Sequence, residues 1–242
     1  MVNSTKSQKN IKTSKLTTVV LDKLALKILE SLANRNLIPD NAKNFNWKQF
    51  HVLRSKAKKK FVVPETSITP LMSRVLFGIT AYYRPMRILA IGTYVGNSFL
   101  FLLGPYLSTN SSRLKYAYGI DINEKATQIA KSNFESLREP FRKIKILTEN
   151  GLTFSKKLHK KFDLIYIDVD DQILRKKIYI QILKNAYPFI KKGGIVLAHD
   201  ICVPKFKKDL SDYLSYVRDK QLFKDTQTLE IDYCGLEISK KV

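Results

Sequence analysis

Acidic side chains end three apolar runs in this sequence, each of a length typical of a buried strand. Asp121, Asp168 and Asp200 hold these positions, and His199 directly precedes the last of them. Carboxylates can accept hydrogen bonds from ribose hydroxyls, bind a hard cation or assist proton transfer. Because parallel strands end at one edge of a sheet, we expect these side chains to form a polar site there.

A turn with two glycines follows the apolar run 87–91. Three residues separate Gly92 from Gly96, and an apolar run of helical length begins after Asn97 and Ser98. Strand, glycine turn and helix form the first unit of a doubly wound sheet, where N–H groups at the helix start face a ligand. Gly92 would allow a backbone conformation closed to other residues, and Gly96 would allow close approach to the ligand. The G-x-G-x-x-G dinucleotide pattern is absent, and a turn without a ligand is the alternative.

Strand-like and helix-like runs alternate along the rest of the chain, which predicts an α/β fold with a doubly wound parallel sheet. The expected strands are 87–91, 115–120, 143–148, 162–168, 193–200, 226–231 and 235–239, and the expected helices are 71–82, 124–138, 173–191 and 205–222. We expect the chain to turn after Gly104-Pro105, and residues 192–194 to cap a helix and lead into the fifth strand.

The N-terminal quarter divides from the rest by composition. Residues 1–15 are too polar to pack and predict a flexible basic tail. Residues 16–61 predict a helical extension, with apolar positions at helical spacing over 16–33 and a second helix over 46–60. Residues 62–242 form the expected main domain, and the extension would pack on its sheet or on a second subunit as a homodimer.

The composition limits the class of protein. The formal net charge is +22, and residues 1–60 hold 14 lysines and arginines against three acids. Such a surface favours a polyanionic partner, although a charge run is usually a solvated face. Two cysteines give neither a disulfide framework nor a zinc pattern, and no apolar run is long enough to span a membrane. A cytoplasmic location is expected.

Residues 64–240 resemble the class I S-adenosylmethionine-dependent methyltransferases, in particular the small O-methyltransferase group that includes the catechol methyltransferases. The resemblance rests on IGTYVGNS at 91–98, GID at 119–121, DLIYID at 163–168, GGIVLAHD at 193–200 and GLEISKK at 235–241. It implies a Rossmann-like seven-stranded sheet with strand order 3-2-1-4-5-7-6 and an antiparallel seventh strand.

The resemblance also implies S-adenosylmethionine as cofactor and assigns residues to it. In the family's pattern, Asp121 would accept the ribose hydroxyls, Ser98 would bind the methionine carboxylate, and Asp168 would lie where cofactor and substrate meet. The alternative for Asp121 is a helix N-cap. The full expected cofactor set is Gly92, Tyr94, Gly96, Ser98, Asp121, Ile122, Asn150 and Asp168. The loop before residue 71 would cover the cofactor, with Ser67 as a candidate lid residue.

Metal-dependent members of the group bind a divalent cation through a fourth-strand Asp and an Asp-Asn pair after the fifth strand. Here Asp168 matches the first position, and the pair is replaced by His199-Asp200. The resemblance therefore implies Asp168, Asp200 and His199 as ligands, with magnesium or manganese as the ion. His199 could instead be a general base, which would make His199 and Asp168 the catalytic residues. A buried histidine satisfied by its neighbours is the third interpretation.

Two positions depart from the family's pattern. Ala90 stands where the first strand usually carries a Glu that organises the cofactor's amino group, and Glu65 or another acid would have to replace it. Asp171 stands where catechol-type members place a Lys base, although Lys176 on the next expected helix could reach the site. A catechol substrate is therefore not indicated.

Three functions remain open on the sequence. The first is O-methylation of a small hydroxylated molecule. The second is methylation of RNA such as tRNA, for which Lys56, Lys58, Lys59 and Lys60 would contact phosphates and Trp47 would stack a base or pack in the core. The third is a degenerate protein that binds S-adenosylmethionine without turnover, motivated by Ala90 and by the missing Lys.

Overall fold

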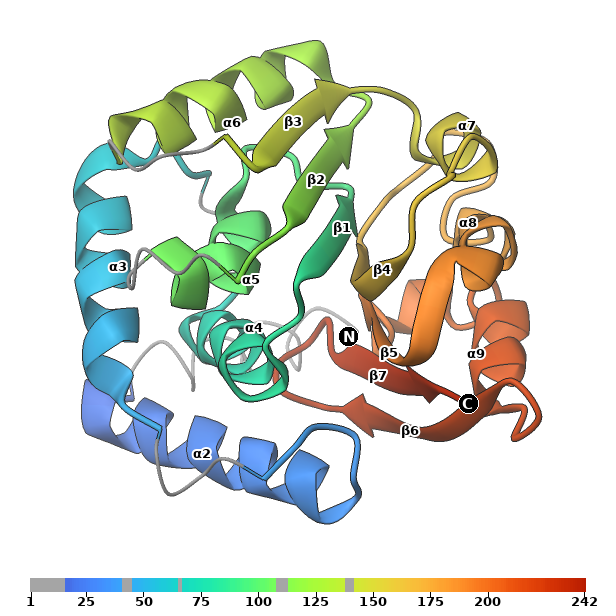
Figure 1. Cartoon of the computed structure of the whole chain (residues 1–242), viewed down its shortest axis with the longest axis horizontal. Helices are drawn as coiled ribbons and strands as arrows, with labels where there is room; N and C mark the ends of the chain where they lie inside the picture. Colours follow the sequence, from blue (N-terminus) through green and yellow to red (C-terminus); the bar gives the residue numbers. More distant parts are fainter. Residues whose placement is uncertain (1–15, 41–44, 65–66, 108–112, 138–141) are drawn as a thin grey trace.

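The computed structural model describes residues 16–40, 45–64, 67–107, 113–137 and 142–242. Its centre is one seven-stranded sheet with strand order β3-β2-β1-β4-β5-β7-β6 (Figure 1). Strands β1 to β5 pair in parallel, and β7 pairs antiparallel with both β5 and β6. The predicted fold class, strand order and antiparallel seventh strand are confirmed.

The strands are short and mostly apolar. They comprise β1 (Arg87–Ile91), β2 (Tyr116–Asp121), β3 (Ile144–Thr148), β4 (Phe162–Ile167), β5 (Ile190–His199), β6 (Phe223–Leu229) and β7 (Leu236–Lys241). Every residue of β4 is buried, as a central strand covered by helices on both faces requires.

Helices cover both faces of the sheet (Figure 1). One apolar core lies between one face and the helices α2 (Thr18–Asn34), α3 (Trp47–Lys60), α4 (Pro70–Tyr83), α5 (Asn97–Leu107) and α6 (Glu124–Ser136). A second core joins the other face to α7 (Gly151–Lys156), α8 (Ile178–Ala186) and α9 (Ser211–Arg218).

The two N-terminal helices lie within the predicted extension 16–61 and belong to the same core as the sheet. Helix α2 packs on α4, where Gly78 has no room for a Cβ because Leu29 would lie 2.3 Å from it. A buried charge joins these helices: the Asp22 carboxylate accepts from Arg74 Nε at 2.6 Å and contacts His51 Nε2 at 2.8 Å. The domain boundary near residue 61 stays a prediction, and the predicted tail 1–15 lies outside the described residues.

The predicted helix 173–191 is wrong at both ends. Before α8, Asp171 Oδ1 accepts from the N–H groups of Ile173 and Leu174, and Arg175 has a φ of 50°, so the chain turns here instead of coiling. After α8, Tyr187–Phe189 is a single 3-10 turn that contains Pro188. A proline inside an α-helix removes a hydrogen bond and clashes with the preceding turn, which favours the early end.

Strand β5 consequently begins at Ile190, so the predicted helix cap at 192–194 is also wrong. Gly193 lies inside the strand with a φ of 72°, and the β4–β5 pairing shifts register between Phe162 and Leu164. Gly193 thus marks a local irregularity within strand β5.

Other boundaries also differ from the sequence prediction. Helix α5 continues through Gly104 and Pro105 to Leu107, where a Cβ on Gly104 would collide with Phe77 and Leu53. Gly104 therefore allows close helix packing instead of ending the helix. The predicted helix 205–222 is reduced to α9, preceded by the 3-10 turn Pro204–Phe206, and α7 was not predicted.

The pairing of the central strands places the candidate site. Ile91 pairs with Ile120 on one side and with Ile167 on the other, so β1, β2 and β4 end at the same level. Gly92 and Asp168 directly follow β1 and β4, and Asp121 is the last residue of β2, so all three lie at the carboxyl-terminal edge of the sheet.

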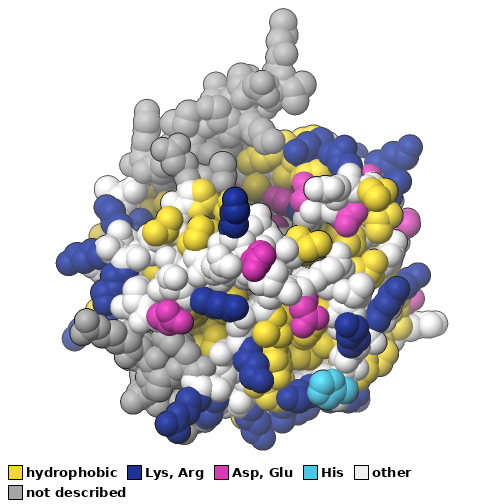
Figure 2. Space-filling model, turned by 90° about the horizontal axis from the view of Figure 1, so that it is seen from above, with side chains coloured by type: hydrophobic (Ala, Val, Ile, Leu, Met, Phe, Trp, Pro, Cys, Tyr) yellow, Lys and Arg dark blue, Asp and Glu magenta, His cyan; other side chains and the backbone are white. Residues whose placement is uncertain are grey.

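Lysine and arginine side chains are spread around the face seen in Figure 2, with fewer acids among them. Within the described residues, no helix is both long enough and apolar enough to cross a membrane.

Removal of the Asp22 carboxylate should destabilise the fold. In Asp22→Ala, the fully buried Arg74 guanidinium loses its ion-pair partner, and we expect the free energy of unfolding to fall by about 3 kcal/mol. Urea denaturation monitored by circular dichroism measures this change. Glu30→Ala removes an exposed acid from the same helix and should change stability by less than about 0.5 kcal/mol. Equal effects of the two variants would contradict the assigned role of Asp22.

Candidate active site

Two cavities meet at the carboxyl-terminal edge of the sheet. The larger has a volume of about 640 Å³ and lies along the ends of β1, β2 and β4. The smaller, about 270 Å³, lies between the turn after β1, the segment before α4 and the ends of β5 and β7. Gly92, Tyr94 and Asp168 line both cavities. The two spaces can therefore hold two parts of one ligand, or a ligand and a second reactant, on either side of Asp168.

The turn after β1 passes directly against the end of β4. Gly92 has a φ of +87°, and a Cβ there would lie 1.8 Å from the carbonyl oxygen of Asp168. The predicted need for glycine at this position is confirmed by both the conformation and the missing space. Any larger residue would push the turn away from Asp168.

The Asp121 carboxylate supports this turn from β2. Its Oδ2 accepts from the backbone N–H of Tyr94 at 2.6 Å, and its Oδ1 accepts from that of Asn123 at 2.9 Å. The N-cap of α6 is Asn123, whose side chain accepts from Ala126 N, so the N-cap alternative for Asp121 is wrong. Asp121 instead lines the larger cavity, where a ribose role stays a prediction.

Ile122 and Asn150, the residues expected near an adenine, also line the larger cavity. Ile122 is 67% exposed, which is unusual for a large apolar side chain and leaves its surface free for a flat ring. Asn150 caps α7, since its Oδ1 accepts from the N–H groups of Leu152 and Thr153. Its predicted contact to adenine would use the amide nitrogen.

Gly96 and Ser98 differ in their surroundings. Gly96 lines neither cavity, and a Cβ there would lie 2.9 Å from the Phe134 ring and 3.3 Å from Ala130 on α6. Gly96 therefore allows α6 to pack on the turn, and the predicted reason for this glycine, close approach to a ligand, is not supported. Ser98 lines the smaller cavity, and its contact with the methionine carboxylate stays a prediction.

The space beside Ala90 is shared with an aromatic side chain that sequence reasoning missed. Ala90 pairs in register with Tyr166 on β4, and both are fully buried in the same core. The Tyr166 hydroxyl donates to Asp168 Oδ2 at 3.0 Å. A polar atom from β4 thus reaches the site where the family's pattern has a carboxylate from the first strand, while Glu65 lies outside the described residues.

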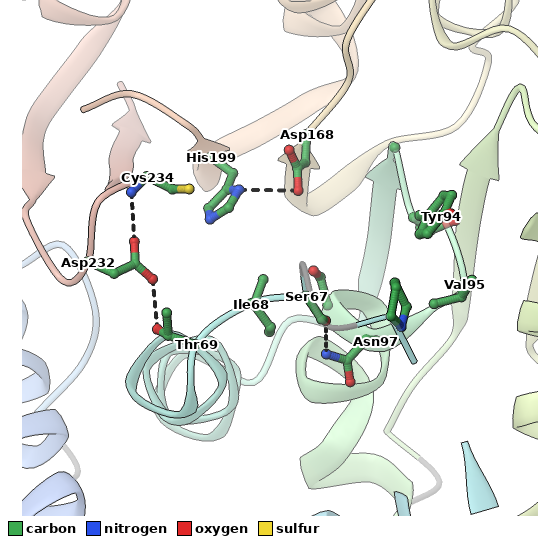
Figure 3. A pocket seen from close by; sticks show the side chains of 14 residues that line it. Ser67, Ile68, Thr69, Tyr94, Val95, Asn97, Asp168, His199, Asp232 and Cys234 are labelled. Carbon is green, nitrogen blue, oxygen red and sulfur yellow. Dashed lines mark hydrogen bonds and ion pairs between the residues drawn. The ribbon is translucent and has the colours of Figure 1, made fainter. Parts of the chain in front are cut away.

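His199, the last residue of β5, lines the smaller cavity and lies next to Asp168 (Figure 3). Its Nδ1 is 3.3 Å from Asp168 Oδ2 and 3.5 Å from Asp200 Oδ1. Its Nε2 is buried and has no hydrogen-bond partner among the described residues. The interpretation as a satisfied core histidine does not account for this free nitrogen, because a buried polar atom without a partner costs free energy.

The acids set the charge of the imidazole. Burial alone would lower the pKa of His199, but the charge and hydrogen bond of Asp168, with Asp200 and Asp232, raise it to about 9. Burial alone would raise the pKa of Asp168, but the His199 imidazolium, followed by the Lys176 ammonium and the Tyr166 hydroxyl, lowers it. Asp168 and the buried His199 therefore form an ion pair at neutral pH.

Lys176 lies among the acids of the site, which the sequence indicated only as a possibility. Its Nζ lies 2.7 Å from Asp200 Oδ2 and 3.8 Å from Asp168 Oδ1. The turn made by Asp171 and Arg175, instead of the expected helix, brings Lys176 to the end of β4. Asp171 stands at the position where a Lys base is expected, and its carboxylate organises this turn instead.

The far wall of the smaller cavity comes from the segment before β7. Asp232 accepts from the hydroxyl of Thr69 at 2.7 Å and from the N–H groups of Cys234 and Gly235 (Figure 3). Burial raises the pKa of the Cys234 thiol well above its ordinary value, so Cys234 is present as the neutral thiol. These residues carry no recognisable sequence motif, and only the fold shows that they face His199.

The segment before α4 closes the cavity from the other side. Ser67 Oγ accepts from Asn97 Nδ2, which joins this segment to the start of α5 (Figure 3). Ser67 and Asn97 both line the smaller cavity, in line with the predicted covering position of Ser67.

The ion pair of His199 makes stability depend on pH in a defined direction. The pKa of His199 is about 9 in the folded chain and about 6.5 when unfolded, so its contribution is fully present below about pH 6.5. Relative to His199→Gln, the free energy of unfolding should fall by up to about 3 kcal/mol as pH rises from 6.5 to 9. Urea unfolding of both proteins across this range measures the difference, and a difference independent of pH would contradict the ion pair.

Comparisons with known proteins agree with this architecture. Residues 89–201 match the family model described as a methyltransferase domain. This range runs from within β1 to just beyond the end of β5 and includes Asp121, Asp168 and His199. No protein in the curated collection searched matches the sequence.

Several solved structures share the fold at low sequence identity. An O-methyltransferase from Bacillus cereus in complex with S-adenosylhomocysteine is 17% identical, with a TM-score of 0.61 over 91% of this chain and 100% of that one. TomG, an O-methyltransferase from Streptomyces achromogenes, is 12% identical, with a TM-score of 0.62 over 82% and 91%. The methyltransferase PaMTH1 from Podospora anserina is 16% identical, with a TM-score of 0.60 over 82% and 97%. The chain therefore shares the seven-stranded fold of these methyltransferases, and its central residues 89–201 match a methyltransferase domain.

Proposed function

We propose that this protein transfers the methyl group of S-adenosylmethionine to a hydroxyl oxygen of a small molecule. The observation that carries the proposal is the free Nε2 of His199, which faces the smaller cavity while its Nδ1 is held by two carboxylates. The Bacillus cereus and Streptomyces structures, which share the fold, are O-methyltransferases bound to S-adenosylhomocysteine and S-adenosylmethionine. This supports the same chemistry here.

The larger cavity suits the adenosine part of the cofactor. We infer that Asp121 binds the ribose hydroxyls, Ile122 packs on the adenine and Asn150 meets its edge, since all three line this cavity. The methionine part would pass Gly92 and Tyr94 towards Ser98 in the smaller cavity. Because Gly92 has no Cβ, the turn can lie directly against Asp168, where the two cavities share a wall, so the residues present fit the cofactor.

The acceptor would occupy the remainder of the smaller cavity. Its walls combine apolar groups from Pro64 and Ile68 with the polar groups of Thr69 and His199. With a total volume of about 270 Å³, part of it needed for the cofactor, the space suits a small molecule.

Bound S-adenosylmethionine supplies an electrophilic methyl group on a sulfonium, so the protein's task is to align an oxygen with it and remove a proton. Neutral His199 would take the proton of the acceptor hydroxyl at Nε2. Asp168 would hold the ring through Nδ1 and stabilise the imidazolium that forms, as the acid does in a hydrolase triad. The negative charge of Asp168 also favours the sulfonium nearby.

The other two functions receive no support from a specific observation. Lys56, Lys58, Lys59 and Lys60 are exposed at the end of α3 and line neither cavity of the site. Trp47 packs against the core beside Phe45 and Phe50, as the core alternative predicts. RNA binding and a homodimer stay predictions of the sequence.

Binding of S-adenosylhomocysteine should depend on Asp121. We expect the wild-type protein to bind it in calorimetric titration, and Asp121→Ala to weaken binding at least tenfold, because both the ribose contact and the support of Tyr94 N are lost.

Glu124→Ala is the matched control for that titration, since Glu124 is an exposed acid three residues further on, in the first turn of α6. It should bind as the wild type does. Absence of binding in the wild type would overturn the proposed cofactor site, and equal binding by Asp121→Ala would remove Asp121 from it.

Loss of the His199 base should reduce methyl transfer. With labelled S-adenosylmethionine and a panel of small phenols and aliphatic alcohols, we expect His199→Gln to be at least about 100-fold slower on any acceptor used by the wild type. Because the pKa of His199 is about 9, the wild-type rate should rise from pH 7 towards pH 9, and the residual rate of His199→Gln should not follow that rise. Wild-type-like turnover by this variant would exclude His199 as the base.

A further inference from the structure

A positive charge is built into the acid cluster of the site. The Lys176 side chain is only 2% exposed, and its Nζ lies 2.7 Å from Asp200 Oδ2 and 3.8 Å from Asp168 Oδ1. It is the only lysine or arginine within 4 Å of either carboxylate among the residues that the structure describes. The two carboxylates therefore share one internal ammonium.

Further contacts hold the ammonium in place. Lys176 Nζ donates to the carbonyl oxygen of Val169 at 2.7 Å and to the hydroxyl of Tyr179 at 3.2 Å. The rings of Tyr179 and Phe206 lie 5.1 and 5.2 Å from it, within the range of cation–π interactions. The position is thus defined on several sides by polar atoms and aromatic faces.

The carboxylates are needed to keep this ammonium buried. Lys176 lies two residues before α8, whose N-cap is Lys177, so the ammonium stands near the positive end of a helix and far from water. A buried cation in such a place is stable only when anionic groups pair with it. Asp200 and Asp168 are those groups.

The same oxygens are the ones that a divalent cation would use. Ligand atoms of Asp168, His199 and Asp200 lie within 4.8 Å of one another, so the sequence-predicted ligands do come together. However, an ion bound between Asp168 and Asp200 would stand beside the buried Lys176 ammonium and compete for Asp200 Oδ2. His199 Nδ1 also faces both carboxylates. These residues do not fit a magnesium or manganese ion while Lys176 keeps its place.

We propose that the Lys176 ammonium replaces the divalent cation of metal-dependent relatives as the partner of Asp168 and Asp200, so that this protein acts without a divalent cation. The inference rests on the proposed methyl transfer. Lys176 would be a positioning residue: it holds Asp200 and Asp168 in the arrangement that orients His199, and it does not itself contact the acceptor.

The direct test is manganese binding, which needs no acceptor. Titration of the wild-type protein with Mn²⁺, followed by electron paramagnetic resonance, should show no site at millimolar concentrations. Lys176→Met keeps the length of the side chain and removes its charge, so Mn²⁺ should bind at least tenfold more tightly than to the wild type. Lys177→Met, which changes the exposed neighbour, should behave as the wild type does. In Lys176→Met with Asp200→Asn, the gained binding should be lost.

The outcomes separate this inference from the proposed function. Wild-type binding of S-adenosylhomocysteine that is unchanged by a chelator or by Mg²⁺, together with no Mn²⁺ site, supports the inference. A Mn²⁺ site in the wild type that Asp200→Asn abolishes overturns it, even if Lys176→Met fails to fold. Absence of S-adenosylhomocysteine binding under all conditions would reject the proposed function, whereas the Mn²⁺ titration would still test the role of Lys176.

Discussion

The charge balance around Asp168 is the constraint on which the site depends. Asp168 stands at the end of a strand buried on both faces, where an unpaired carboxylate would be very costly. Contacts with His199, Lys176 and the Tyr166 hydroxyl offset that cost. Because each partner comes from a different element, the sheet, the turn before α8 and the end of β5 must all be in place before the carboxylate is stable. The site and the fold therefore stabilise each other.

The backbone of Asp168 also fixes the position of the glycine turn relative to the Asp168 carboxylate. The carbonyl of Asp168 fills the space that a Cβ on Gly92 would need, and the Asp168 N–H donates to Ile91 O at 2.8 Å. The glycine turn is thus pressed against β4 by main-chain contacts, and its position relative to the carboxylate is not adjustable by side-chain rotation. Such rigid support gives both cavities a common wall at Gly92, which a transfer reaction between two ligands requires.

Departures from the family's sequence pattern are accompanied by local replacements. Ala90 lacks the carboxylate that the family's first strand usually carries. Tyr166 on the adjacent strand brings a hydroxyl to Asp168. Asp171 replaces the expected Lys, and it makes the turn through which Lys176 enters the same cluster. Loss of a residue type at one position therefore does not imply loss of its charge or polarity at the site, so neither departure by itself indicates a degenerate protein.

The sequence by itself determined the fold class, the strand order and the gathering of Gly92, Asp121, Asp168, His199 and Asp200 at one edge of the sheet. Apolar runs ending in acids were sufficient for the fold class and for the shared edge, because parallel strands end at a common level, whereas the strand order was implied by the resemblance to the methyltransferases. Local signals also explain the errors at α8 and β5, since Asp171, Pro188 and Gly193 were present but were outweighed by helical periodicity. The role of Gly96 was not readable, because the space beside it is taken by α6.

Only the tertiary structure decided which groups complete the site. Lys176 and Asp232 lie outside the motifs, and Tyr166 lies within DLIYID without any sign of its role. Their side chains reach the site through a turn, the loop before β7 and a strand pairing. The charge of His199 and the partner of Asp200 follow from distances of a few ångströms between elements far apart in the sequence. Electrostatic energies change steeply over such distances, which is why residue order alone does not determine them.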